Sequence, residues 1–169
     1  GVFESHRKIV DMYARMGYPP ESLENYFAHL KIFEERGMKR GIASCYRNIG
    51  IVYGMMGNYP EALEYHLAAL KISEEIGDKW GIADCYSNIG DVYVDINDHQ
   101  EALEFYFVSL KKWEEIGQRY FVSVCYNNIG DAYASMGNPS EALDNYFTCL
   151  NYFGKDTIYA STINSHNNI

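Results

Sequence analysis

The chain has 169 residues, of which 47% are hydrophobic, so it is long enough to bury a substantial core. Its net charge of −9, from 23 acidic and 14 basic residues, argues against nucleic acid or an anionic membrane surface as the main partner. No apolar run approaches the ~18–20 residues that span a bilayer, and Gly1-Val2-Phe3-Glu4-Ser5 is not a signal peptide. We expect a cytoplasmic fragment of a longer protein.

The chain repeats one stretch at a fixed interval. Cys45-Tyr46-Arg47-Asn48-Ile49-Gly50, Cys85-Tyr86-Ser87-Asn88-Ile89-Gly90 and Cys125-Tyr126-Asn127-Asn128-Ile129-Gly130 begin at the evenly spaced positions 45, 85 and 125. A fixed period of this length is typical of a solenoid. It divides the chain into units 1–40, 41–80, 81–120 and 121–160, within a single repeat domain that spans 1–169.

Each unit predicts two helices and no strand. In the second unit Ile42, Cys45, Ile49 and Val52 follow the spacing of an amphipathic helix. Residues that tolerate a left-handed conformation stand where the helices should end. They are Gly17, Gly57, Asn97 and Gly137 after the first helices, and Gly37, Gly77 and Gly117 after the second helices.

Two further patterns recur in each unit. The second helices are preceded by a capping residue with Glu three positions later: Asn58 and Glu61, Asp98 and Glu101, Asn138 and Glu141. A glycine recurs inside the first helix, where it costs about 0.5–1 kcal/mol relative to alanine. These glycines (Gly50, Gly90, Gly130) predict a close approach of the partner helix, with Ala62, Ala102 and Ala142 as the small residues opposite.

The tyrosines and cysteines that recur are expected to serve the core. Tyr53, Tyr93 and Tyr133 fit as packing residues, although an aromatic stripe that binds a ligand is the alternative. Cys45, Cys85 and Cys125 lie about one repeat apart, which is too far for a disulfide, so we expect buried thiols.

At this point the chain resembles a known family. Asn48-Ile49-Gly50, Tyr53, Gly57, Tyr59, Ala62 and Ala69 stand at the spacings of the tetratricopeptide repeat (TPR). The usual unit has about 34 residues, shorter than the units of this chain. The longer variant resembles Pins-type G-protein-signalling modulators and the sensory regions of bacterial kinases, cyclases and transcription regulators. The resemblance implies an all-α, right-handed αα superhelix, a TPR solenoid whose first helices line a concave groove.

Catalysis has little support in the sequence, and we expect neither an enzyme nor a metal or other cofactor. The five histidines are scattered, and His66 occupies a slot that Tyr26, Tyr106 and Tyr146 fill in the other units. No HExxH, phosphate-binding loop or nucleophile elbow is present. The Glu pairs that recur near the ends of the second helices lie four residues after a lysine, which predicts a solvated, ion-paired face.

The resemblance places ten candidate residues in a peptide-binding groove. They are Arg7, Arg15, Arg47, Asn48, Asn88, Asp91, Asp95, Asn127, Asn128 and Asp131. Asn48, Asn88 and Asn128 form a ladder, and a side-chain amide can pair with both the N–H and the C=O of an extended peptide. Alternatively, these amides bond neighbouring helices. Pins-type repeats often carry a second Asn three residues later, where this chain has Ile51, Asp91 and Asp131.

The predicted groove is also polarised. Its N-terminal half carries Arg7, Lys8, Arg15 and Arg47, whereas its C-terminal half carries Asp84, Asp91, Asp95 and Asp131. A bound peptide should then carry acidic residues at one end and basic residues at the other. We expect a module that binds an extended or helical segment of another protein. The alternative is a regulatory, sensory or self-associating scaffold domain of a larger signalling protein.

The C-terminal residues begin to repeat the pattern again. Ser165-His166-Asn167-Asn168-Ile169 aligns with Cys125-Tyr126-Asn127-Asn128-Ile129. Residues 158–169 are therefore expected to begin a partial fifth unit or capping helix, packed on the second helix of unit four through Ile158 and Ile163. The alternative is a degenerate tail. Half a cap would leave apolar surface exposed, which favours homo-oligomers through this end.

Overall fold

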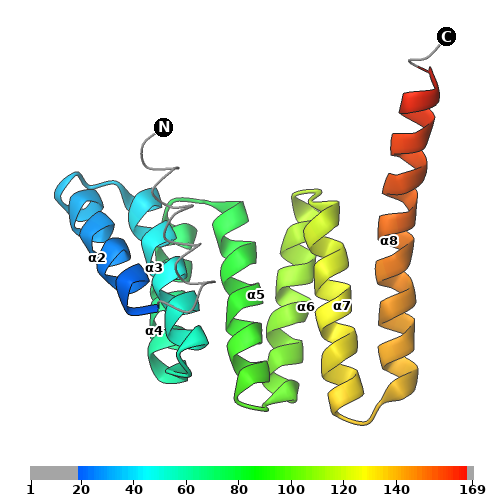
Figure 1. Ribbon diagram of the computed structural model, residues 1–169, viewed down its shortest axis with the longest axis horizontal. Coiled ribbons are helices and arrows are strands. Elements are labelled where there is room, and N and C mark those ends of the chain that lie inside the picture. Colours follow the sequence, from blue (N-terminus) through cyan, green and yellow to red (C-terminus); the bar gives the residue numbers. More distant parts are fainter. Residues whose placement is uncertain (1–18, 167–169) are drawn as a thin grey trace.

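The protein is a row of antiparallel helices stacked side by side (Figure 1). The computed structural model describes residues 19–166, with side chains from 22 to 152. In this part the helices are α2 (Pro19–Glu35), α3 (Lys39–Met55), α4 (Tyr59–Glu75), α5 (Lys79–Asp95), α6 (His99–Glu115), α7 (Arg119–Ser135) and α8 (Pro139–His166). No strand occurs among the residues described, so the all-α helical repeat is confirmed. The predicted first helix of unit one, with Gly17, lies outside these residues.

Left-handed residues end the helices as the sequence predicts. Gly57, Asn97 and Gly137 follow the first helices with φ of 77°, 64° and 77°. The second helices α2, α4 and α6 end two residues before a glycine of the same kind. An L residue with a side chain rarely adopts this conformation, and glycine adopts it at little cost.

The capping prediction holds at one site and fails at another. The carboxylate of Asp98 accepts a hydrogen bond from the Glu101 backbone N–H at 3.3 Å. Asn58 makes no such bond with its side chain, so the expected cap of α4 is wrong. Asp78, which the pattern did not single out, caps α5 by accepting from the Gly81 N–H at 3.2 Å.

The recurring glycines do mark a close contact, but the residue opposite is not the one predicted. A Cβ on Gly90 would lie 2.7 Å from the Tyr106 ring, and one on Gly130 would lie 2.5 Å from the Tyr146 ring. On Gly50 it would lie 2.6 Å from the His66 ring. The second helix therefore lays a ring, not an alanine, on each glycine. The buried alanines lie elsewhere; Ala62, for example, lies near Gly54.

The cysteines and the other tyrosines serve the core, as expected. Cys45, Cys85 and Cys125 are free and buried, and so is Cys149. Burial raises the pKa of Cys45 to about 11 and that of Cys85 to about 12, so these thiols stay protonated. Tyr53 stacks on Tyr65 with ring centroids 5.5 Å apart, which fits a packing residue.

The last helix differs from the expectation. α8 is one helix of 28 residues, and it runs past the point where α4 and α6 stop (Figure 1). No separate helix begins near Ile158, which lies inside α8. The physical reason is in the sequence: position 157, which corresponds to Gly37, Gly77 and Gly117, is Thr157. No residue there favours the left-handed turn, so the helix continues.

Candidate functional site

Eight of the ten predicted site residues fall on the described first helices, α3, α5 and α7. They are Arg47 and Asn48 on α3, Asn88, Asp91 and Asp95 on α5, and Asn127, Asn128 and Asp131 on α7. All eight are exposed or half-buried. We call this surface, together with Ile51 and Met55, the first-helix face. Arg7 and Arg15 lie outside the described residues.

Tyrosines of the second helices hold two carboxylates on the first-helix face. The Tyr106 hydroxyl donates to Asp91 Oδ1 at 2.6 Å, and the Tyr146 hydroxyl donates to Asp131 Oδ1 at 2.7 Å. Each of these rings lies over a glycine of the first helix, which leaves room for the ring to pass and its hydroxyl to reach the face. The two carboxylates are therefore fixed in position before any partner arrives.

The environment of the Asp91–Tyr106 pair shifts both pKa values upward. Burial and then the neighbouring Asp91 charge raise the pKa of Tyr106, so its hydroxyl keeps the proton and donates it. Asp91 is exposed as a residue, yet crowding around its carboxyl desolvates it and raises its pKa, against the hydrogen bond from Tyr106.

Unit two lacks this pair, and both partners differ there. His66 stands in place of the tyrosine and Ile51 in place of the aspartate. His66 is buried, and its Nδ1 has no hydrogen-bond partner. Burial, and then the nearby Arg47 charge, lowers the pKa of His66 to about 4, so the ring is neutral. Ile51 and Met55 are exposed and make this stretch of the face apolar.

Sequence reasoning missed the pairing, although the repeats carried a signal for it. Asp11 and Tyr26 occupy the same two positions in unit one, as Asp91 and Tyr106 do in unit three. Tyrosine thus goes with aspartate in units one, three and four, and histidine goes with isoleucine in unit two. A comparison of these two positions across the four units would have found it.

Two of the three amides of the predicted ladder, those of Asn88 and Asn128, have partners within the protein. Asn128 Nδ2 on α7 donates to Asp91 Oδ1 on α5 at 3.4 Å, which links two first helices. Burial raises the pKa of the Asp84 carboxyl, against the Arg47 charge and a hydrogen bond from Asn88, both of which lower it. Asn127 Nδ2 donates to Asp131 Oδ2 at 3.0 Å. Because an amide nitrogen carries two N–H donors, each of these groups keeps one for a partner.

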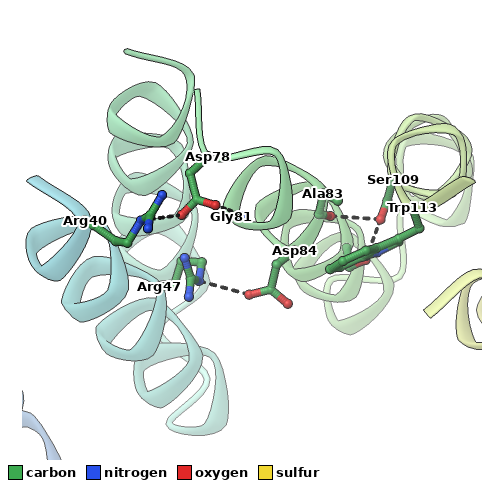
Figure 2. A network of polar contacts seen from close by, with 9 residues as sticks. Arg40, Arg47, Asp78, Gly81, Ala83, Asp84, Ser109 and Trp113 are labelled. Carbon is green, nitrogen blue, oxygen red and sulfur yellow. Dashed lines mark hydrogen bonds and ion pairs between the residues drawn. The ribbon is translucent and has the colours of Figure 1, made fainter. Parts of the chain in front are cut away.

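Arg47 and Asp84, which were expected at opposite ends of the groove, pair with each other. Their Nε and Oδ2 atoms lie 2.9 Å apart, and Figure 2 shows the bridge between α3 and α5. The Arg47 guanidinium also lies 5.2 Å from the centre of the Trp80 ring. In the described residues, no basic side chain is within ion-pair distance of Asp91, Asp95 or Asp131. The described part of the face is therefore acidic.

A hollow of about 710 Å³ opens among α2, α3 and α5, near the N-terminal end of the described stack. Its lining includes Tyr26, Phe33, Arg47, Asn48 and Trp80, which come from α2, α3 and α5.

The structure adds little that favours catalysis. The described residues hold no group of three or more His, Cys, Asp or Glu that could bind a metal ion. None of the helices described is long and apolar enough to cross a membrane. The recurring Glu pairs are exposed, but their ion pairs are not the predicted ones: Glu75 pairs with Lys39 at 3.0 Å, and Glu115 with Lys112 at 3.4 Å.

Comparison with known proteins identifies the family. A family model described as "Tetratricopeptide repeat" matches residues 2–75 and 42–111, and a second one of the same description matches 122–146. The chain belongs to the tetratricopeptide repeat family. Proteins of this family generally act as non-catalytic scaffolds for protein interactions. No curated protein matches the chain.

Solved structures share this fold at low sequence identity. BtubC from P. vanneervenii is 20% identical with a TM-score of 0.77, over 88% of this chain and 62% of that one. Aspartyl phosphate phosphatase F from Bacillus subtilis is 15% identical with a TM-score of 0.84, over 91% and 40%. A signal transduction ATPase with a tetratricopeptide repeat sensor, from Pyrococcus horikoshii, is 20% identical with a TM-score of 0.77, over 94% and 25%. This chain thus spans less than two thirds of each of them.

Proposed function

We propose that this TPR domain is a non-catalytic module that binds a segment of another protein along the first-helix face. The observation that carries the proposal is the pair of carboxylates that second-helix tyrosines hold in place, Asp91 and Asp131. Groups that are fixed before binding lose little conformational entropy on binding, so they favour affinity. They are spaced by one repeat, as contacts to an extended or helical segment would be.

The charges of the face suggest the chemistry of that segment. Asp91, Asp95 and Asp131 favour lysine or arginine side chains opposite units three and four. Ile51 and Met55 favour an apolar side chain opposite unit two. Since Arg47 is already paired with Asp84, an acidic preference at the N-terminal end would depend on Arg7 and Arg15.

A set of labelled peptides with graded charge tests the proposal by fluorescence anisotropy. We expect basic peptides to bind and Asp91→Asn and Asp131→Asn to weaken that binding several-fold. Asp144→Asn is the matched control, because Asp144 is an exposed aspartate of α8 outside the face. Equal effects of all three substitutions would contradict the proposal.

The asparagine ladder is tested in the same assay. If Asn88 and Asn128 hold a peptide backbone, Asn88→Ala and Asn128→Ala should each weaken binding by about 1–2 kcal/mol and leave the melting temperature nearly unchanged. A large drop in melting temperature, with binding unchanged, would show that these amides only tie the helices together.

The alternative is a regulatory or sensory domain that contacts its own chain. One structural neighbour carries its repeats as a sensor, and this chain covers only 25% of that protein. In that case the ligand of the first-helix face is a segment of the same protein. Peptides taken from the full-length sequence would then bind in the anisotropy assay, and peptides from other proteins would not.

A further inference from the structure

The C-terminal end of the stack exposes a face that is buried in every other described unit. Leu110 of α6 is 8% exposed, as is Leu70 of α4, because the next first helix packs on them. Leu150 holds the same position in α8 and is 62% exposed. Leu103 is 4% exposed and Leu143 is 54% exposed, whereas Leu23 and Leu63 at the same position are half-buried. In the other units a first helix covers this face. We call the exposed face of α8, which includes Leu143 and Leu150, the bed.

The chain itself carries the sequence that fits this bed. In the other units, the helix that covers the corresponding face begins four residues after the second helix ends, as Lys79 follows Glu75. One unit after Arg119, that start falls at Tyr159, and Ser165-His166 then align with Cys125-Tyr126. By repeat register, the last residues of α8 correspond to a fifth first helix.

These residues cannot reach the bed of their own chain in this conformation. Residues 139–166 form a single helix, and a continuous helix cannot fold back on itself. The hinge that lets α4 and α6 turn is a left-handed glycine, Gly77 or Gly117, and α8 has Thr157 there. The segment and its bed are thus held apart.

We propose that a second copy of the chain supplies the missing helix, in a dimer in which the two α8 helices lie antiparallel and exchange their C-terminal segments. Keeping the register of the internal repeats places position 159 of one copy beside position 155 of the other. The two-fold axis then passes at position 157, and residues 148–166 overlap. Each segment covers the partner's Leu150. Such an exchange gives a two-fold symmetric dimer that leaves no further copy to be added. It uses the packing of a second helix against the next first helix, which each repeat already makes within one chain.

The test is the oligomeric state of the full 169-residue chain, measured by light scattering or sedimentation at up to on the order of 100 µM, where complexes of micromolar Kd are populated. We expect a mass approaching twice the 19.4 kDa of the monomer. Leu150→Asp should reduce it to the monomer. Leu67→Asp is the matched control, since Leu67 is also a second-helix leucine and is 51% exposed away from this bed. Deletion of 158–169 should also give the monomer.

Three results would overturn the proposal. A wild-type monomer throughout this range would mean that the segment does not bridge two copies. A dimer that survives deletion of 158–169 would mean that two free faces pack directly. A dimer lost equally in Leu150→Asp and Leu67→Asp would mean that the two copies do not associate specifically through the bed on α8. Because Leu150 is already exposed in the monomer, the variant is expected to fold, which circular dichroism checks. The outcome is independent of whether the first-helix face binds peptide.

Discussion

At the scale of single residues, the face depends on rings that cross from one helix to the next. Tyr106 and Tyr146 each lie on a glycine and end on a carboxylate, so one side chain serves both the core and the surface. Unit two replaces both partners, with His66 and Ile51. The imidazole of His66 is buried with no partner for its Nδ1, and burial disfavours its protonated form, which predicts a pH dependence of stability.

The stability of the domain should fall in mild acid because of His66. Its pKa of about 4 in the folded protein lies below the 6.5 of the unfolded chain. The unfolded chain therefore binds a proton first, so this contribution is complete above pH 6.5 and is lost as the pH falls toward 4. The loss should amount to roughly 2–3 kcal/mol at pH 4.5.

Urea unfolding of the wild type and of His66→Tyr at pH 7 and pH 4.5 measures the contribution of His66 to the free energy of unfolding. The difference between the two proteins cancels the other titrating groups, including Asp84 and Asp91. We expect the wild type to lose roughly 2–3 kcal/mol more than the variant between the two pH values. Equal losses would mean that His66 is solvated or protonated in the folded state.

At the scale of helices, the glycines inside the first helices differ in whether there is room for a side chain beside them. Gly90 meets the Tyr106 ring, whereas Gly54 has nothing nearer than Ala62 Cβ at 4.0 Å. Gly90→Val should therefore destabilise the domain by about 1–3 kcal/mol through overpacking. Gly54→Ala should stabilise it by about 0.5–1 kcal/mol through helix propensity. Thermal melts of both variants provide the comparison, and an unchanged Gly90→Val would contradict the close contact.

The end of α8 gives a second prediction at this scale. If the helix runs on because position 157 lacks a residue suited to the left-handed turn, Thr157→Gly should let the chain turn there as it does at Gly117. The segment could then close on its own Leu150. We expect a monomer with a higher melting temperature. A variant that remains dimeric would show that the missing glycine is not what keeps α8 straight.

The sequence predicts most of these elements because their signals are local. Apolar spacing and the glycines at 57 and 77 place helices and turns without reference to the rest of the chain. The Tyr106–Asp91 pair joins residues on two helices, and no local pattern marks it. The Arg47–Asp84 bridge was missed because each charge was assigned to the groove on its own, without its neighbour in the next unit. The repeat register predicts that a new helix starts near Ile158. That prediction is wrong because the turn before such a helix needs a residue like Gly117, and Thr157 stands there.

At the scale of the whole molecule, the described stack presents acidic side chains on α5 and α7 and an exposed apolar face on α8. The acidic side chains of the first-helix face account for part of the net charge of −9. The outer helices carry their own exposed apolar residues, Leu67 on α4 and Phe107 on α6. Two surfaces thus compete as the binding site for a partner, and charge favours the first-helix face for a basic segment.

Amide chemical shifts of the ¹⁵N-labelled domain, titrated with the basic peptide that binds most tightly, test this account most directly. The account predicts that the perturbed amides cluster on α5 and α7 around Asp91 and Asp131 and weaken with added salt. Perturbations centred instead on Leu67 and Phe107, with α5 and α7 unchanged around those carboxylates, would contradict it.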